Sequence, residues 1–147
     1  MSSLSLDLPV EADRLVPQRP PMIAIDRLTE FQGGWGGVES TIAPDSIFVR
    51  DDGSVEPAVL VELIAQAFAA VKGYENLIGG NPVAKGFLVE VKRFEVFGTA
   101  YRGERLSIVI DKSGATDDFA LAHGTVMRED AAIASGNVMV WIPREAP

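Results

Sequence analysis

The longest apolar segment of the chain, residues 57–73, reads PAVLVELIAQAFAAVKG and offers no side that suits water. Its length and its alanine, leucine and glutamine content favour a helix over a strand. Pro57 suits the first helical position, and Gly73 suits the residue that follows the last turn. Because a helix that is apolar all round must be buried, the pattern predicts one central helix over residues 57–73.

The segments around this helix are apolar or alternate between apolar and polar residues, which is the period of a strand. Two such segments precede the helix and four follow it: residues 22–31, 38–42, 86–97, 106–111, 119–128 and 132–142. A glycine-rich turn at 33–37, with Trp35 at its tip, joins the first two into a hairpin. We expect a bulge near Lys92 and Arg93, and a turn at Glu129 and Asp130.

This order of elements contains no alternation of strands and helices, so a doubly wound parallel sheet is not expected. It predicts an α+β domain in which an antiparallel sheet of about five or six strands wraps around one long buried helix (57–73). Residues 1–13 are expected to form an arm or a short edge element, and residues 17–21 an extended segment. Residues 74–85 are expected to form a loop.

Composition narrows the class of protein. The chain has 147 residues, a net charge of −8, no cysteine and one histidine. This length fits one domain spanning residues 1–147, and the charge argues against nucleic acid or an anionic membrane as a partner. The lack of thiolates and the single histidine argue against a metal site, and no cofactor is expected. We see no signal peptide and no apolar run near membrane-spanning length, so we expect a cytoplasmic protein.

Two polar residues interrupt the predicted helix. Glu62 and Gln66 are four residues apart and therefore lie on one face, one turn above the other. An ionisable carboxylate within such a helix is costly unless it is paired or lines a cleft. Glu62 is therefore the first candidate for a functional residue.

Short motifs along the chain point to a known family. They are Val16 to Met22 with Asp26-Arg27, Phe48 to Gly53 with Pro57-Ala58, Glu62 with Ala65, Gln66, Ala67, Ala69 and Ala70, Gly86 to Leu88, Gly103 to Leu106, and Val138 to Pro143. In this order and spacing they resemble the hotdog-fold dehydratases that remove water from 3-hydroxyacyl groups on acyl carrier protein. The chain is most similar to the branch of aryl-polyene-type lipid pathways. The resemblance covers residues 14–143 and implies a hotdog fold and a dimer joined at sheet edges.

The resemblance is weaker at the residues that carry the chemistry. Members of this family use a histidine together with a helix Asp or Glu across a dimer interface. The loop that carries this histidine in classical members corresponds to residues 46–50 and holds none, and the histidine of the branch's Pro-His-Arg motif is Gln18 in this chain. A glutamine side chain hydrogen-bonds a substrate but cannot titrate near neutral pH, so it cannot act as a general base.

Each candidate site residue has a functional and a structural interpretation. Glu62 is either the acid of the reaction, kept protonated by burial, or a carboxylate tied to backbone N–H groups or to Arg19. Gln66 either orients Glu62 or substrate, or packs at the dimer seam. Gln18 and Arg19 either line the mouth of the cleft or form a proline-rich corner.

Four further residues carry alternatives. Gly86 and Phe87 either present a backbone N–H to the thioester carbonyl, or the glycine relieves crowding against the helix. Arg50 either meets a phosphopantetheine phosphate or is a solvated loop residue. His123 lies in the middle of a strand, where we expect a structural or surface histidine rather than the missing base.

Three hypotheses on function remain open from the sequence. The first is a 3-hydroxyacyl thioester dehydratase with Glu62 as acid and an unconventional base. The second is a non-catalytic subunit that binds acyl chains or pairs with an active hotdog partner, which supplies the histidine. The third is a thioesterase in which the helix carboxylate activates water. All three imply acyl-ACP or acyl-CoA as the bound thioester, and a homodimer or a hotdog heterodimer.

Overall fold

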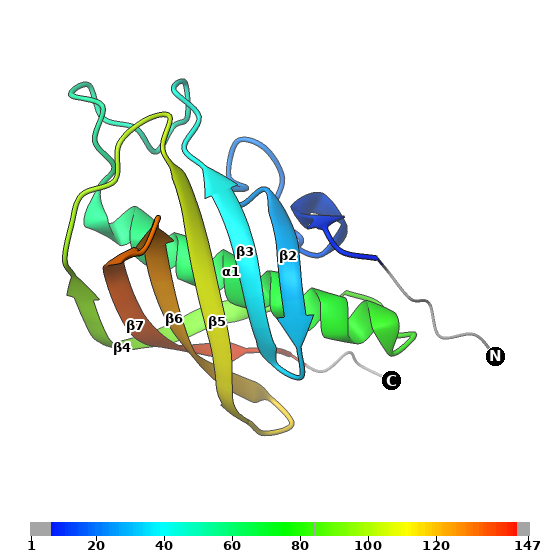
Figure 1. Cartoon of the computed structure of the whole chain (residues 1–147). Helices are drawn as coiled ribbons and strands as arrows, with labels where there is room; N and C mark the ends of the chain where they lie inside the picture. Colours follow the sequence, from blue (N-terminus) through cyan, green and yellow to red (C-terminus); the bar gives the residue numbers. More distant parts are fainter. Residues whose placement is uncertain (1–6, 84, 144–147) are drawn as a thin grey trace.

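The computed structural model describes residues 7–83 and 85–143, and its elements follow the expected order of a hairpin, one long helix and four further strands. One sheet curls around the helix, as Figure 1 shows. In chain order the elements are β1 (Val10–Glu11), the 3-10 turn η1 (Ala12–Arg14), β2 (Arg27–Gln32), β3 (Trp35–Thr41), α1 (Pro57–Ile78), β4 (Phe87–Val96), β5 (Arg105–Ala115), β6 (Phe119–Arg128) and β7 (Ala131–Trp141).

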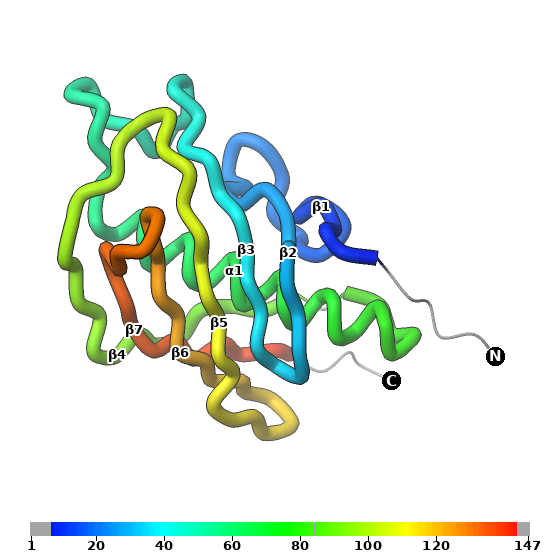
Figure 2. The backbone as a smooth tube through the Cα atoms, viewed as in Figure 1, coloured from blue at the N-terminus to red at the C-terminus, as the bar shows by residue number. Residues whose placement is uncertain are grey.

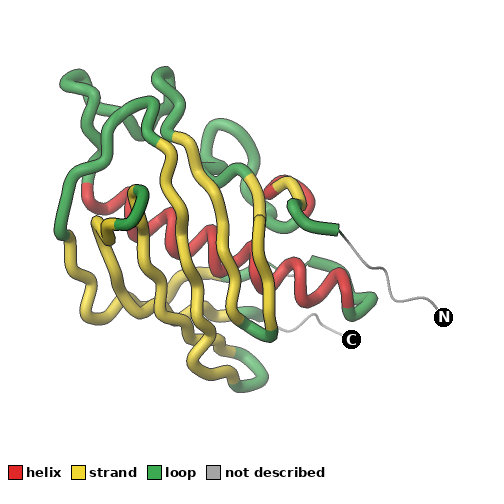
Figure 3. The backbone as a smooth tube through the Cα atoms, viewed as in Figure 1, coloured by secondary structure: helices red, strands yellow, loops and turns green. Residues whose placement is uncertain are grey.

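All seven strands pair antiparallel in a single sheet with the order β1-β2-β3-β5-β6-β7-β4. Along β6 exposed and buried residues alternate, from exposed Phe119 and buried Ala120 onward, which separates an outer face from an inner face. Strand β4 lies at one end of the sheet and, among the described residues, pairs only with β7 (Figure 3). The second edge of β4 is therefore open within the described part of the chain.

The core lies between α1 and the inner face of the sheet, which the helix crosses in Figure 2. Burial of each large apolar side chain there contributes about 1.5–3 kcal/mol. Gly124 of β6 permits this packing, because a methyl group at that position would overlap the Cγ2 atom of Ile64. The largest fully buried apolar side chains of α1 and β5 are Leu60, Leu63, Ile64, Phe68, Leu106, Ile108 and Ile110.

The predicted end of the central helix is wrong. The helix begins at Pro57, as expected, but it continues through Gly73 to Ile78, where a loop was predicted. Gly73 lies inside the helix because the backbone carbonyl of Leu15 packs against it and leaves no space for a side chain. The glycine therefore reflects a close approach between two backbones and not a helix stop.

Three expected strand boundaries also differ from the structure. The strand expected over 106–111 is longer, because β5 continues its pairing with β6 to Ala115. The first strand begins at Arg27 and not at residue 22, because the backbone of Met22 and Ala24 bonds to the side chain of Gln66 instead of to another strand. The turn of the first hairpin is Gly33–Gly34 alone, both with positive φ, and Trp35 is already part of β3. The expected bulge is confirmed, since the register of β4 shifts between Lys92 and Glu95.

Several connecting segments are also settled by the structure. The expected edge element within residues 1–13 corresponds to β1, whereas residues 1–6 lie outside the described residues. The expected extended segment at 17–21 closes into a turn, in which the backbone N–H of Met22 donates to the carbonyl of Arg19.

At 22 residues, α1 is long and apolar enough to cross a membrane, which corrects the expectation that no segment approaches that length. Its packing against the sheet accounts for this apolar character.

Candidate functional site

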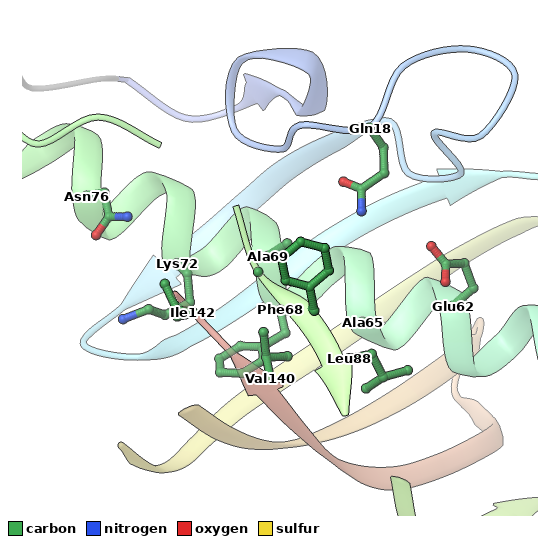
Figure 4. A pocket seen from close by; sticks show the side chains of 12 residues that line it. Gln18, Glu62, Ala65, Phe68, Ala69, Lys72, Asn76, Leu88, Val140 and Ile142 are labelled. Atoms are coloured by element: carbon green, nitrogen blue, oxygen red, sulfur yellow. The ribbon is translucent and has the colours of Figure 1, made fainter. Parts of the chain in front are cut away.

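A cavity of about 180 Å³ lies between α1 and the residues at which β4 begins and β7 ends. Glu62 and Gln18 line it together, and Figure 4 shows the Gln18 side chain extending from its loop toward the helix that carries Glu62. Glu62 comes from the helix, whereas Gln18 comes from the turn between η1 and β2. The sequence thus predicted two residues that the fold brings to one cavity from positions 44 residues apart.

The carboxylate of Glu62 is held by Gln66, as one of the two interpretations of Gln66 predicted. Gln66 Nε2 donates to Glu62 Oε2 at 2.6 Å and to the carbonyl of Met22 at 3.0 Å. Gln66 Oε1 accepts the backbone N–H of Ala24 at 2.8 Å, which fixes which end of the amide faces Glu62. Gln66 is only 1% exposed and does not itself line the cavity. It therefore positions Glu62, whose other carboxylate oxygen has no hydrogen-bond partner among the described residues.

The Gln66→Met variant is expected to lower the free energy of unfolding by about 2 kcal/mol. Methionine keeps a similar volume, but it leaves the backbone N–H of Ala24 and the carbonyl of Met22 without their partner. Urea unfolding followed by circular dichroism measures the change. The matched control is Gln32→Met at an exposed position, which is expected to change stability by less than about 0.5 kcal/mol. Equal stability of both variants would show that the amide of Gln66 has no anchoring role.

The amide oxygen of Gln18 is the second polar group of interest in the cavity. This Oε1 atom is buried and has no hydrogen-bond partner among the described residues. The backbone around it is fixed by Arg19, whose Nη1 donates to the carbonyls of Val16 and Gln18 at 2.8 Å each. Arg19 itself is exposed and does not line the cavity. The structure therefore separates two residues that the sequence grouped, with Gln18 in the cavity and Arg19 supporting its loop.

Gly86 and Phe87 also line the cavity, at the point where β4 begins. A methyl group on Gly86 would lie 2.7 Å from Val140 Cγ1, so the glycine relieves crowding against β7 and not against the helix. The ring of Phe87 packs beside that of Trp141, with centroids 5.9 Å apart. These contacts hold the start of β4 close to the cavity wall, which is where a backbone N–H donor was expected.

His123 and Arg50 lie away from the cavity. His123 is exposed on the outer face of β6, and its Nδ1 atom is 3.0 Å from Asn137 Oδ1 on β7. Arg50 is an exposed loop residue that donates to Ser54 Oγ and forms an ion pair with Glu56 at 3.9 Å. Both positions agree with the structural interpretations of these residues.

Sequence reasoning missed two polar residues at the other end of the cavity. Lys72 and Asn76 lie on the same helix face as Glu62 and line the cavity with it. The signal was present in the spacing, because positions 62, 65, 69, 72 and 76 are separated by three or four residues and hence share one face. The early helix end predicted at Gly73 removed Asn76 from this pattern.

Comparison with known proteins assigns this chain to a family. The ApeP-like family, described as ApeP dehydratase, matches residues 10–147. YcsD of Bacillus subtilis, described as uncharacterized, is 23% identical over 145 residues, which cover 98% of this chain and 100% of that protein.

Two solved structures illustrate the similarity in fold. The dehydratase heterocomplex ApeI:P from Xenorhabdus doucetiae matches with a TM-score of 0.87 at 18% identity, over 92% of this chain and 93% of that chain. A hypothetical thioesterase from Streptococcus pneumoniae, solved with coenzyme A, matches with a TM-score of 0.63 at 9% identity, over 82% and 87% of the two chains. The expected hotdog fold is confirmed by these likenesses.

Proposed function

Because the chain belongs to the ApeP-like dehydratase family, we propose that it is an acyl-thioester-binding subunit of a hotdog heterodimer whose other subunit supplies the catalytic base. The proposed substrates are 3-hydroxyacyl thioesters, from which water is removed to give 2-enoyl thioesters. The cavity between α1 and β4 is the proposed binding site. The heterocomplex of similar fold supports an assembly of two different hotdog chains.

The observation that carries this proposal is the position of the only histidine of the chain. Dehydration needs a base for the α-proton and an acid for the leaving hydroxide. This chain has a single histidine, His123, which lies on the outer face of the sheet. A second copy of the chain brings only a second His123, which lies on the outer face of its own sheet. A different protein is therefore the proposed source of the catalytic histidine.

The open edge of β4 is the proposed binding site for such a partner. Six of the ten residues of this edge strand are apolar, and exposed apolar residues on a sheet edge invite pairing with another strand. The start of β4 also forms one wall of the cavity, so a chain that pairs along this strand reaches the site directly. The exposed apolar residues of the strand and its end are Phe87, Leu88, Val89, Val91, Val96 and Phe97.

Within the site, the residues of this chain take the remaining roles. The partner's base removes the α-proton, and the electron pair forms the Cα–Cβ double bond while the Cβ–O bond breaks. Glu62, held by Gln66, gives its proton to the leaving hydroxide, which departs as water. Gln18 and the backbone N–H of Phe87 are the proposed donors to the thioester carbonyl, where negative charge develops.

A second candidate function is hydrolysis of the thioester. Gln66 occupies Oε2 of Glu62, so the other carboxylate oxygen is available to activate a water molecule without a histidine. The fold shared with the hypothetical thioesterase that was solved with coenzyme A supports this alternative. Hydrolysis releases a free thiol, whereas dehydration does not, and this difference separates the two reactions.

The test is to express the chain alone and together with the hotdog protein encoded nearest to its gene. Each preparation is mixed with a 3-hydroxyacyl thioester, and both the 2-enoyl product and free thiol are followed. We expect the chain alone to bind the thioester without turnover and the complex to dehydrate it. Dehydration by the chain alone would contradict the need for a partner, and release of thiol lost in Glu62→Gln would establish the thioesterase instead.

The Val91→Glu variant is expected to weaken association with the partner at least about tenfold. A charge at this half-exposed position would be buried without a partner group when β4 pairs with another strand. Analytical ultracentrifugation of the mixed chains measures the effect. The control is Leu121→Glu, which has the same 36% exposure but lies on the outer face of β6. Equal weakening by both variants would place the interface elsewhere.

A further inference from the structure

The polarity of the residues that line the cavity changes along α1. Glu62 lies at one end, whereas Lys72 and Asn76 lie at the other, as Figure 4 shows. Ten residues separate Glu62 from Lys72, which corresponds to about 15 Å along a helix. The wall between these ends is apolar and is formed by Ala65, Phe68, Ala69, Leu88, Val140 and Ile142. The cavity therefore has two polar ends and an apolar middle.

The far end carries an excess of positive charge. Lys72 Nζ and Lys112 Nζ lie 3.7 Å and 3.8 Å from the same oxygen atom, Glu75 Oε1. Among the described residues, Glu75 is the carboxylate within ion-pair distance of either lysine, so two ammonium groups share one carboxylate. Neither contact is short enough for a hydrogen bond, and Glu75 Oε1 is buried without one.

The electrostatics of Lys72 agree with this excess charge. Burial lowers the pKa of its ammonium group below the usual range, and the neighbouring Lys112 lowers it further. Glu75 raises this pKa but does not offset the other two effects. A second anion next to Lys72 would bring the cluster to two cations and two anions, and would stabilise the charged form of the lysine.

The apolar middle of the cavity indicates which part of a thioester lies there. The pantetheine arm of a carrier has two amides, and burying an amide without a hydrogen-bond partner is unfavourable by about 1–3 kcal/mol. A hydrocarbon chain has no such groups and gains from contact with Leu88, Val140 and Ile142. The acyl chain, and not the carrier arm, therefore fits between Glu62 and Lys72.

We propose that the substrate is an acyl thioester whose distal end carries an anionic group, such as an ω-carboxylate, which binds to Lys72 and Asn76. This inference rests on the proposed function, because it places the reacting end of the acyl group at Glu62. The cluster of Lys72, Lys112 and Glu75 then selects substrates by their far end. A methyl-terminated chain of equal length fills the same cavity but leaves the shared carboxylate as the only counter-ion among the described residues.

The test measures binding, so that it does not depend on turnover. The purified chain is titrated with ω-carboxyacyl and methyl-terminated 2-enoyl thioesters of matched length, over a series of lengths. We expect the ω-carboxyacyl thioester to bind about tenfold more tightly than the methyl-terminated thioester, at the acyl length that binds best. Lys72→Met keeps the aliphatic stem and is expected to abolish this preference while methyl-terminated chains bind as before. Lys112→Met frees Glu75 to neutralise Lys72 and is expected to reduce the preference.

Two controls separate this inference from its alternatives. Lys92→Met removes a charge on the exposed outer side of β4 and is expected to leave the preference unchanged. Each acyl chain is also carried on coenzyme A and on N-acetylcysteamine, which has no phosphate. If Lys72→Met weakened only the coenzyme A thioesters, whatever their far end, the lysine would bind a carrier phosphate and the inference would be overturned. Tight binding of methyl-terminated chains without any preference would overturn it while leaving the proposed function intact, and no binding of any thioester would overturn both.

Discussion

The Gln18→His variant is expected to dehydrate 3-hydroxyacyl thioesters without a partner, at a rate about 10²–10⁴-fold above that of the unmodified chain. Position 18 lines the same cavity as Glu62, and its backbone is held by the contacts of Arg19. A histidine there titrates near neutral pH and supplies the base that an amide cannot provide. The measurement is the absorbance of the 2-enoyl thioester product, with the unmodified chain in parallel.

The double variant Gln18→His with Glu62→Gln is the control for this experiment. It keeps the new base but removes the acid, and we expect it to lose most of the gained activity. A Gln18→His variant that folds and binds thioester but shows no dehydration would contradict the proposed position of the reacting carbons between these two residues. Activity that survives loss of Glu62 would assign the acid to another group.

Local patterns in the sequence were sufficient for most of the fold. The apolar segment from Pro57 predicted the central helix, and the alternation over 119–128 predicted β6 with the boundaries that the structure has. These predictions succeed because burial against one layer imposes a period of 2 or 3.6 residues on the sequence itself. The turn at Glu129, which has a positive φ, was likewise marked by local residue types.

The errors occur where a residue is determined by a distant segment. Gly73 has the same residue type as a helix stop, and only the packing of Leu15 against it explains why the helix continues. Residues 22–25 form an apolar run that is typical of a buried strand, but Gln66, more than 40 residues away, binds the backbone of Met22 and Ala24. Such contacts leave no periodic signal, so a local pattern cannot distinguish them.

Only part of the candidate site could be predicted, because some of its residues also depend on distant segments. Glu62 stood out because a carboxylate within an apolar helix is costly, and Gln18 stood out through the resemblance to a family motif. Lys72 and Asn76 were missed because their role depends on the full length of α1. Leu88 and Val140 are unremarkable strand residues in the sequence, and they become cavity walls only when β4 pairs with β7.

The Gly73→Ala variant is expected to lower the free energy of unfolding by about 3 kcal/mol, and the melting temperature by about 10 °C. Intrinsic helix propensity predicts the opposite, since alanine stabilises a helix interior by about 1 kcal/mol relative to glycine. The close approach of the Leu15 carbonyl decides the sign, because both groups in contact belong to buried backbone and cannot rotate away as a side chain does. Thermal and urea unfolding followed by circular dichroism provide the two quantities.

Gly114→Ala is the matched control, because a methyl group at that position in β5 meets only Leu121 Cδ1, at 4.0 Å. We expect it to change stability by less than about 0.5 kcal/mol. Leu15 lies three residues before Gln18, so the displacement that Gly73→Ala forces on this segment is also expected to weaken thioester binding at temperatures where the variant is still folded. A stabilised Gly73→Ala variant would show that the segment around Leu15 moves away at little cost. Its packing would then not be the reason why the helix continues through a glycine. Destabilisation with unchanged binding would show that the position of Gln18 is set by Arg19 and its loop, independently of the helix.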